Sequence, residues 1–319
     1  MISRWWRLTF STAALVFVCA IFSVGCTGGS AGGGSGVTGE IIRVSRQNNS
    51  GTYAYFKEVV IGKDGFFKQG SIDQSGSKDV VELVGKTPNA IGYSGMGYAN
   101  ESVRMLPVSK AGGAAVPPTS EAASSGDYPL ARGLNIYTIG APEGALKHYL
   151  EWILSAEGQE IVTEIGYVPA PGGGGAAPEG DPPAGSIKIA GSDTMVNLAQ
   201  KWAEVYMSKY SQVKLEVSGG GSGVGLAGLQ KGTTQLANAS RDIKQKEIDA
   251  IKEKFDSDVS EFVVALDALA VYVHPSNPLT EISMEDLKAI YGEGGTTENW
   301  EQVSNWPAEV VEPAGSGTN

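Results

Sequence analysis

Three short stretches of this sequence combine hydroxyl, glycine and charged residues in patterns that suit an oxyanion. They are Arg46 with Ser50-Gly51-Thr52, Gly191-Ser192-Asp193-Thr194, and the glycine-rich run 218–223. Each stretch follows a predicted strand and precedes a predicted helix. Helix N-termini present backbone N–H groups and a positive dipole end, so hydroxyls and a guanidinium beside them favour binding of a negatively charged group.

Simpler interpretations remain open for two of these stretches. Ordinary helix capping would explain 191–194, because Ser, Asp and Thr are preferred N-cap residues. A flexible loop would explain 218–223, which lacks the lysine of a nucleotide P-loop and the spacing of a dinucleotide fingerprint. The stretch at Arg46 is the most informative, since a guanidinium, two hydroxyls and a helix start lie within seven residues.

Strands and helices alternate along the chain at the spacing of βαβ units, which predicts an α/β fold of mixed, mostly parallel sheets flanked by helices. The Gly/Pro/Ala-rich segment 169–185 is predicted to be a linker between organised blocks at about 38–168 and 186–303. Strands are predicted at 41–44, 187–190, 213–217, 235–239, 262–266 and 269–273, and helices at 79–84, 143–154 and 195–210. Ser283 has the capping-box pattern that starts a further helix through 290.

The N-terminal segment 1–25 is predicted to be a signal peptide, because two arginines precede an apolar run that ends in small residues. Ser23-Val24-Gly25-Cys26 resembles the cleavage box of bacterial lipoproteins. This resemblance implies lipidation of Cys26, secretion across the cytoplasmic membrane and anchoring on its outer face, in the periplasm or at the cell surface. An uncleaved membrane anchor is the alternative. Residues 26–37 are predicted to form a flexible Gly/Ser tether, and 304–319 a disordered tail.

Composition excludes several classes of function. The net charge of −11 argues against a nucleic-acid partner, since phosphate backbones require a basic surface. Cys19 and Cys26 are the only cysteines, so a processed chain would keep no thiol for a disulfide or a thiolate metal site. No His-Glu-x-x-His spacing and no nucleophile elbow with a plausible base occurs. We therefore expect neither enzyme activity nor a metal or cofactor.

Motifs across nearly the whole chain resemble the phosphate-binding proteins of bacterial phosphate ABC transporters, which have the type II periplasmic-binding fold. The motifs are Arg46-x-x-x-Ser50-Gly51-Thr52, Ala90-Ile91-Gly92-Tyr93, Tyr128-Pro129-Leu130-Ala131-Arg132, Ile189-Ala190-Gly191-Ser192-Asp193-Thr194, Gly219–Gly225, Ala239-Ser240-Arg241-Asp242 and Asn277-Pro278. The resemblance implies a monomer of two lobes that captures inorganic phosphate between them and delivers it to the permease subunits of an importer. The alternative is another tetrahedral oxyanion, such as sulfate, molybdate or tungstate; a phosphate-ester hydrolase or an adhesive lipoprotein fits less well.

The order of the two blocks differs from that of the family, in which the segment like 186–303 comes first. The sequence therefore resembles a circular permutant whose usual ends are joined by the linker 169–185. On this interpretation lobe one spans 134–272, and lobe two is discontinuous, spanning 38–133 and 273–303. Chain termini that lie close together in space make such a rearrangement physically possible.

The resemblance also implies a phosphate site shared by both lobes. Lobe one would contribute Thr194, Met195 and Ser222. Lobe two would contribute Arg46, Ser50, Gly51 and Thr52. At the position of the family's discriminating carboxylate this sequence has Arg241, followed by Asp242. Either Arg241 is a ligand, or Asp242 or Asp193 accepts the proton of phosphate, and these alternatives stay open.

Overall fold

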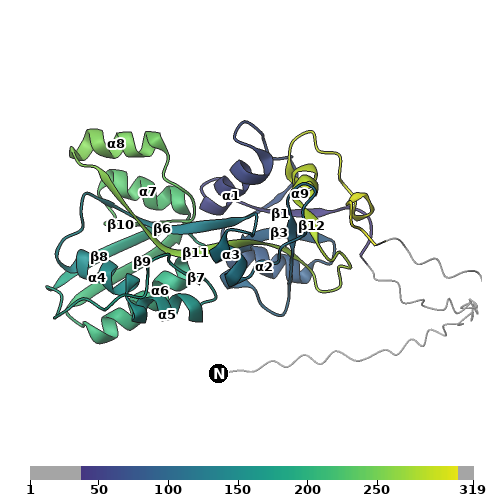
Figure 1. Cartoon of the computed structure of the whole chain (residues 1–319). Coiled ribbons are helices and arrows are strands. Elements are labelled where there is room, and N and C mark those ends of the chain that lie inside the picture. Colours follow the sequence, from purple (N-terminus) through teal and green to yellow (C-terminus); the bar gives the residue numbers. More distant parts are fainter. Residues whose placement is uncertain (1–36, 308–319) are drawn as a thin grey trace, which may run out of the picture. The chain divides into compact units, whose positions relative to one another are not determined.

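The computed structural model describes residues 37–307, which belong to one compact unit (Figure 1). The predicted signal peptide, most of the tether with Cys26, and residues 308–319 of the predicted tail lie outside the described residues. Among residues 37–307, no helix is both long enough and apolar enough to cross a membrane.

Ten strands form one mixed sheet among the described residues. The strand order along its main path is β2-β1-β3-β11-β6-β10-β8-β9. These strands are β1 (Ile42–Arg46), β2 (Ile72–Gln74), β3 (Ala90–Gly95), β6 (Ala131–Ile139), β8 (Gly185–Gly191), β9 (Val213–Gly220), β10 (Leu236–Ala239) and β11 (Val259–Val273). β4 (Arg104–Leu106) and β7 (Val168–Pro169) pair with β11, while β5 (Val108–Ser109) and β12 (Ile282–Ser283) pair with each other. The predicted α/β class is confirmed. Mostly parallel pairing is not, because β6 and β11 pair antiparallel with their neighbours.

β11 corrects the prediction of two short strands at 262–266 and 269–273, because it is one continuous strand of 15 residues. Asp267 falls in the gap between the two predicted strands, and carboxylates are almost never fully buried unless they are paired. In the structure Asp267 is fully buried and lies directly across from Arg132 of β6, with Nη2 of Arg132 2.7 Å from Oδ2 of Asp267. The uninterrupted strand pairs with β6 along its first part and with β3 along its last.

The predicted helices at 79–84, 143–154 and 195–210 are confirmed, whereas the helices Ser120–Ser125 and Ala156–Glu164 were not predicted from the sequence. The helices are α1 (Gly51–Phe56), continued by the π-helical turn η1 (Lys57–Ile61), α2 (Ser77–Lys86), α3 (Ser120–Ser125), α4 (Gly144–Leu154), α5 (Ala156–Glu164), α6 (Val196–Lys209), α7 (Ser222–Lys231), α8 (Gln245–Phe255) and α9 (Met284–Tyr291), with 3₁₀ turns η2 (Met96–Tyr98) and η3 (Trp300–Gln302). The predicted start of α9 is confirmed: Ser283 Oγ accepts from the Asp286 N–H at 2.9 Å and donates to Asp286 Oδ2 at 2.7 Å.

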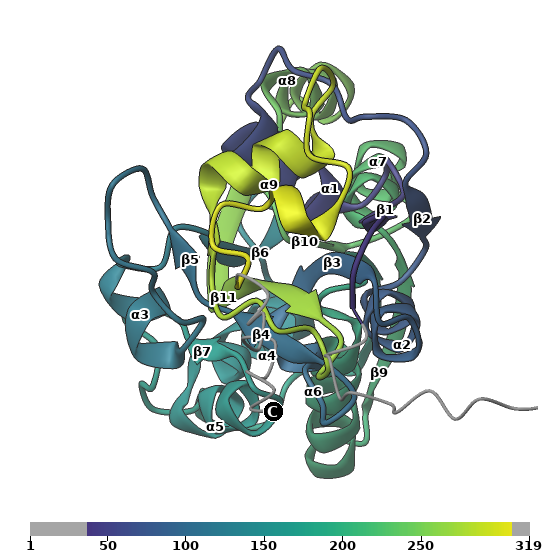
Figure 2. The same ribbon diagram turned by 90° about the vertical axis from the view of Figure 1, so that its right-hand side faces the viewer.

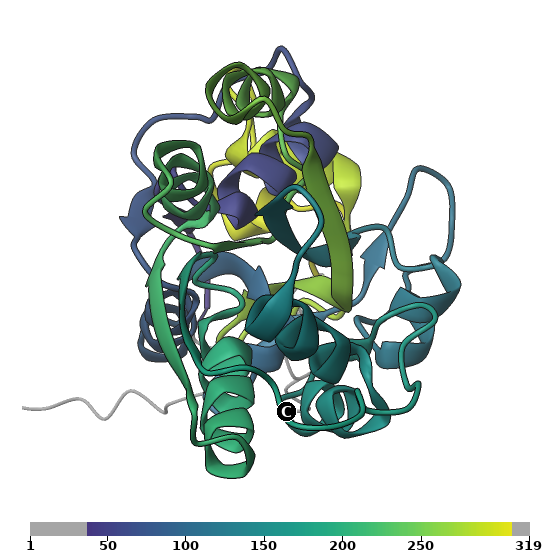
Figure 3. The same cartoon turned by 90° about the vertical axis from the view of Figure 1, so that its left-hand side faces the viewer.

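Around β8, β9 and β10 the helices cover both faces of the sheet (Figures 1 and 3). Leu236 of β10 packs in the same buried cluster as Leu198 and Trp202 of α6. Its neighbour Ala237 packs in another cluster with Leu226 of α7 and with α8. Because successive strand residues point to opposite faces, α6 lies on one face and α7 with α8 on the other. This arrangement fixes the starts of α6 and α7, which hold two of the predicted site stretches.

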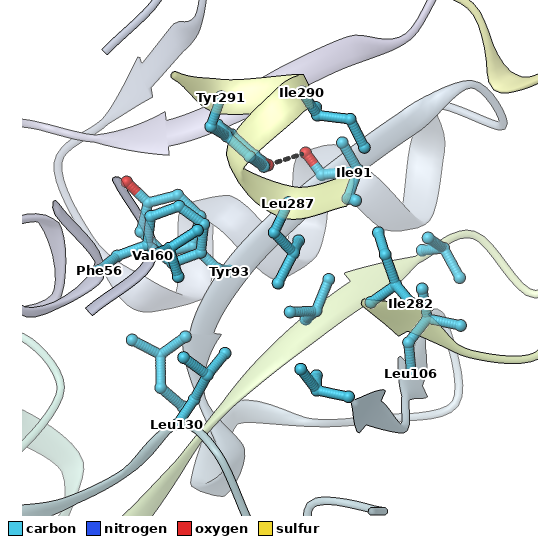
Figure 4. Close-up of a cluster of buried hydrophobic side chains, with 14 of the residues drawn as sticks. Phe56, Val60, Ile91, Tyr93, Leu106, Leu130, Ile282, Leu287, Ile290 and Tyr291 are labelled. Carbon is cyan, nitrogen blue, oxygen red and sulfur yellow. Dashed lines mark hydrogen bonds between the residues drawn. The ribbon is translucent and has the colours of Figure 1, made fainter. Parts of the chain in front are cut away.

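A second set of buried clusters surrounds β1 and β3, with α1 and α9 on one face and α2 on the other (Figure 2). In Figure 4, Phe56 of α1 stacks on Tyr93 of β3, with ring centroids 3.8 Å apart. Tyr291 of α9 packs edge-on against both rings and donates a hydrogen bond of 2.8 Å to the Ile91 carbonyl. This packing positions α1, and with it the predicted stretch at 50–52.

The two ends of the described chain lie side by side. Ile41 N donates to Glu298 O at 2.7 Å, Trp300 N donates to Gly39 O at 2.9 Å, and Gly39 N donates to Glu301 Oε1 at 2.8 Å. Adjacent ends are what a circular permutation requires. The permutation and the boundaries of the lobes nevertheless stay predictions, since residues 37–307 cluster as one compact unit.

The first residues of the segment predicted to be a disordered tail are packed against the fold. Ser304 Oγ donates to Asp286 Oδ1 at 2.8 Å, and the ring of Trp306 stacks on Trp300 with centroids 5.4 Å apart. The indole ring of Trp306 buries a large apolar surface, and this contact orders the first residues of a segment that was predicted to be disordered.

A reordered chain tests the permutation. We expect a chain opened between Ala176 and Ala177, with Val303 joined to Val37 by a short Gly/Ser link, to fold and to bind its ligand within about twofold of the original, because the new link spans adjacent ends. Circular dichroism and thermal unfolding measure the folding. Opening the chain instead inside β11, between Ala265 and Leu266, is the control and should prevent folding. A reordered chain that stays unfolded would contradict the permutation.

Candidate functional site

The starts of α1 and α7, from separate parts of the chain, are in direct contact. Gly223 N of α7 donates to Asn49 O at 3.0 Å, and Asn49 Nδ2 donates to Gly220 O at 2.8 Å. Gly51, the first residue of α1, lies so close to Ser222 that a Cβ on Gly51 would overlap Ser222 Oγ. The predicted stretches at 50–52 and 218–223 are thus brought together.

The start of α6 reaches the same place. Thr52 Oγ1 of α1 lies 2.8 Å from Thr194 Oγ1, just before α6, and both side chains are buried. Three helix N-termini therefore point their positive dipole ends towards one small region. Hydroxyls of Thr52, Thr194 and Ser222 line that region, which gives it the donors that a tetrahedral oxyanion needs.

The remaining predicted residues near this point serve local structure. Ser50 caps α1, and its Oγ accepts from Thr52 N at 3.1 Å and Tyr53 N at 3.4 Å. Met195 is fully buried, its N–H donates to Ser192 O at 3.0 Å, and its side chain packs in the core beside α6. Ser222 Oγ accepts from Ser240 N at 3.1 Å.

Arg46, the last residue of β1, is fully buried beside the helix starts. Its guanidinium donates to Gln74 O at 3.3 Å, Ser75 O at 2.8 Å and Ser77 Oγ at 2.9 Å, and it forms an ion pair of 3.2 Å with Asp193. Burial lowers the pKa of Arg46, and the negative charge of Asp193 opposes this shift. Arginine keeps its proton in proteins, so a full positive charge lies at the site.

Asp193 links the three stretches. Its Oδ2 accepts from Arg46, and its Oδ1 accepts from Gly220 N at 2.8 Å. Asp193, Arg241 and Asp242 are the candidates for the position of the family's discriminating carboxylate. In the described structure Asp193 is hydrogen-bonded to Arg46 and Gly220, whereas Arg241 and Asp242 contact neither of them. Of these three residues, Asp193 is therefore the one that pairs with the buried charge of Arg46.

Arg241 and Asp242 line a cavity of about 760 Å³ that lies beyond the helix starts, between α1–η1 and the start of α8. The Arg241 guanidinium donates to both carboxylate oxygens of Glu247 at 2.8 and 2.9 Å, and Asp242 is exposed. Glu247 also accepts from Lys244 N at 2.8 Å, as an acidic residue in the first turn of α8. The Glu247 carboxylate thus holds the Arg241 guanidinium at the start of α8. The position of Arg241 next to Ser240 in the sequence does not predict this direction.

Residues that the sequence analysis did not assign also hold the site. Tyr98 OH donates to Asp193 O at 2.6 Å, and Tyr167 OH donates to Thr194 O at 2.6 Å. Burial raises the pKa of Tyr98 to about 12, so its hydroxyl stays a neutral donor. Both tyrosines are far in sequence from the turn that they fix, and no local signal points to them. Within residues 37–307, no group of three or more His, Cys, Asp and Glu side chains could hold a metal ion.

Comparisons with known proteins identify the family of this chain. The model of the PBP superfamily domain matches residues 18–157 and 176–319. The chain belongs to the PBP superfamily. It is 28% identical over 302 residues to a phosphate-binding protein, PstS 2, of Streptococcus agalactiae, covering 91% of this chain and 97% of the relative. It is 41% identical to the phosphate-binding protein PstS of Pseudomonas aeruginosa over 131 residues, 40% of each chain.

A solved PBP structure is also similar. The crystal structure described as the phosphate-binding protein of a phosphate ABC transporter from Streptococcus pneumoniae is 25% identical, with a TM-score of 0.65, and the match covers 83% of this chain and 100% of that one. Together these likenesses make this a PstS-like member of the PBP superfamily, a family of solute-binding proteins. The two segments matched by the PBP model leave out 158–175, which overlaps the predicted linker at 169–185.

Proposed function

We propose that this PstS-like chain captures inorganic phosphate between its two lobes and delivers it to the membrane subunits of an ABC importer. The observation that carries the proposal is the meeting of three helix starts at the contact between Thr52 and Thr194, beside the buried charge of Arg46. The names of the Streptococcus and Pseudomonas relatives support phosphate as the anion.

Binding follows from the chemistry of these groups. Four phosphate oxygens need many donors, and the hydroxyls of Thr52, Thr194 and Ser222 supply them together with the N–H groups of the helix starts. Arg46 supplies the full positive charge, while Asp193, which pairs with Arg46, would accept the proton of a protonated phosphate and repel an anion without one. Because the donors come from both lobes, the closed form is favoured when the anion contacts both.

Further properties follow as part of this proposal. We expect no turnover, since binding and release of an unchanged ion require no nucleophile or base. We expect a monomer outside the cytoplasmic membrane, held there by lipid on Cys26. Cys26 lies outside the described residues, so mass spectrometry of the membrane-bound protein is the direct test of this anchor.

The contact between the two threonines provides a test of the shared site. We expect Thr52→Val and Thr194→Val each to weaken phosphate binding about 10- to 100-fold, because each removes one hydrogen bond to a charged ligand. Equilibrium dialysis with labelled phosphate measures the affinity, and colour release from a phosphate ester measures turnover. Thr138→Val is the matched control, since Thr138 is buried in β6 and bonds Gly140 O. Equal affinities in all three variants, or turnover of the ester, would contradict the proposal.

A further inference from the structure

A second buried arginine, Arg132, lies at the start of β6, where this strand passes from one set of core clusters to the other (Figure 1). Its guanidinium donates to Asp267 Oδ2 from Nε at 3.0 Å and from Nη2 at 2.7 Å. It also donates from Nη1 to Ser240 O at 3.0 Å and from Nη2 to Thr52 Oγ1 at 3.2 Å. Its side chain is only 2% exposed, and that of Asp267 is fully buried.

The contact with Thr52 determines how that hydroxyl is used. A guanidinium can only donate, so Thr52 Oγ1 accepts from Arg132 and keeps its own hydrogen for another acceptor. In the structure Thr194 Oγ1 lies 2.8 Å from Thr52 Oγ1 and can accept this hydrogen. An anion oxygen between the lobes would take the same hydrogen. Arg132 therefore orients Thr52 as a donor towards the place where the anion binds.

The positive charge of Arg132 acts on the Arg46 guanidinium. Burial is the main reason for the lowered pKa of Arg46, and the positive charge of Arg132 contributes to it. Two like charges in a buried region disfavour each other, and an anion between them relieves this repulsion. One Nη1 hydrogen of Arg132 has no partner within residues 37–307, which leaves a donor for such an anion.

Arg132 also borders the cavity of about 760 Å³ between α1–η1 and the start of α8. The basic side chains on this cavity outnumber the acidic ones, and its charged lining is Lys57, Lys63, Arg132, Arg241 and Lys244 with Glu58 and Asp242. Three of these five cations are paired with carboxylates, Lys63 with Glu58, Arg132 with Asp267 and Arg241 with Glu247, so Lys57 and Lys244 are left to attract an anion locally. Arg132 connects this cavity with Thr52 and thus with the helix starts.

We propose that Arg132 is a second arginine of the anion site, that it contacts the bound oxyanion and orients Thr52, and that Asp267 holds its guanidinium in place. This inference rests on the proposed function, because it assigns a further residue to the same site. It differs from a purely structural role of the pair, in which Arg132 and Asp267 would only join β6 to β11. Both carboxylate oxygens of Asp267 are hydrogen-bonded, because Oδ2 accepts from Arg132 and Oδ1 accepts from Met96 N at 2.9 Å.

The test compares single and paired neutral substitutions in the full chain. Arg132→Gln alone leaves Asp267 as an unpaired buried charge, so this variant can lose stability for reasons unrelated to the ligand. The double variant Arg132→Gln/Asp267→Asn removes both charges and keeps two amides that can bond each other. We expect it to remain folded in thermal unfolding, and to bind inorganic phosphate about 10- to 100-fold more weakly than the original chain in calorimetric titration.

A second comparison isolates the link to Thr52. If Arg132 orients this hydroxyl, adding Thr52→Val to the double variant should cost less affinity than Thr52→Val costs in the original chain. The control is Arg43→Gln/Glu298→Gln, which removes another Arg–carboxylate pair, 2.8 Å apart in the original, away from the helix starts. It should leave phosphate affinity unchanged. A folded Arg132→Gln/Asp267→Asn variant that binds phosphate as the original does, with additive effects of Thr52→Val, overturns this inference; no phosphate binding by the original chain overturns the proposed function instead.

Discussion

Replacing Arg46 with methionine is expected to weaken phosphate binding by about 100-fold or more, because it removes the full positive charge and a forked donor from the buried site. The same change should lower the free energy of unfolding by about 2–3 kcal/mol, since it removes the hydrogen bonds that Arg46 donates to the Ser75 carbonyl, Ser77 Oγ and Asp193 Oδ2. Calorimetric titration measures the affinity, and urea unfolding measures the stability.

Two further variants separate charge from geometry at this position. Arg46→Lys keeps the charge and loses the fork, so it should bind phosphate with an affinity between those of the original and the methionine variant. Arg43→Met lies on the same strand and pairs with Glu298 rather than with the site, so it is the matched control and should bind normally. An Arg46→Met protein that stays folded and keeps its phosphate affinity would contradict the assigned site.

Gly51→Ala is expected to prevent the lobes from closing. An added Cβ would overlap Ser222 Oγ and lie 2.6 Å from Ser240 Oγ, so the starts of α1 and α7 would be forced apart. Phosphate affinity should fall about 100-fold, because ligands from both lobes could no longer contact one anion together. The free energy of unfolding should change by less than about 1 kcal/mol, since alanine is favourable at a helical position once the lobes separate.

The expected effect at Gly51 is steric, and its measurement should show this. Small-angle X-ray scattering with and without phosphate reports closure, which the original chain should undergo and the Gly51→Ala chain should not. Gly175→Ala is the control, because a Cβ at Gly175 meets no atom within 4 Å. If the Gly51→Ala chain closes on phosphate and binds it with unchanged affinity, the steric prediction is wrong, because α1 and α7 then need not approach each other for binding.

Local signals in the sequence predicted the loops of the site well. The hydroxyl, glycine and arginine pattern at 46–52 and the turn at 191–194 both precede helices in the structure, and both reach one place. The cap at Ser283 was equally readable, because capping depends on residues three apart. Features that arise from neighbouring residues are therefore recoverable from one sequence.

The remaining parts of the site depend on pairing between distant segments. Arg132 and Asp267 are 135 residues apart, and only the register of β6 against β11 places them together. Without that pairing, the prediction left Asp267 in a gap between two short strands. Arg241 is a different case: it adjoins Ser240 in sequence, and in the structure its guanidinium pairs with Glu247. Sequence adjacency alone does not fix the direction of a long side chain.

The most direct test of phosphate capture is a calorimetric titration of the full chain, freed of bound anion by dialysis, first with phosphate and then with sulfate. One-to-one binding of phosphate, with sulfate binding far more weakly, is the result that the buried arginines and the nearby carboxylate of Asp193 predict. A folded chain that binds neither anion, or that prefers sulfate, would contradict the account.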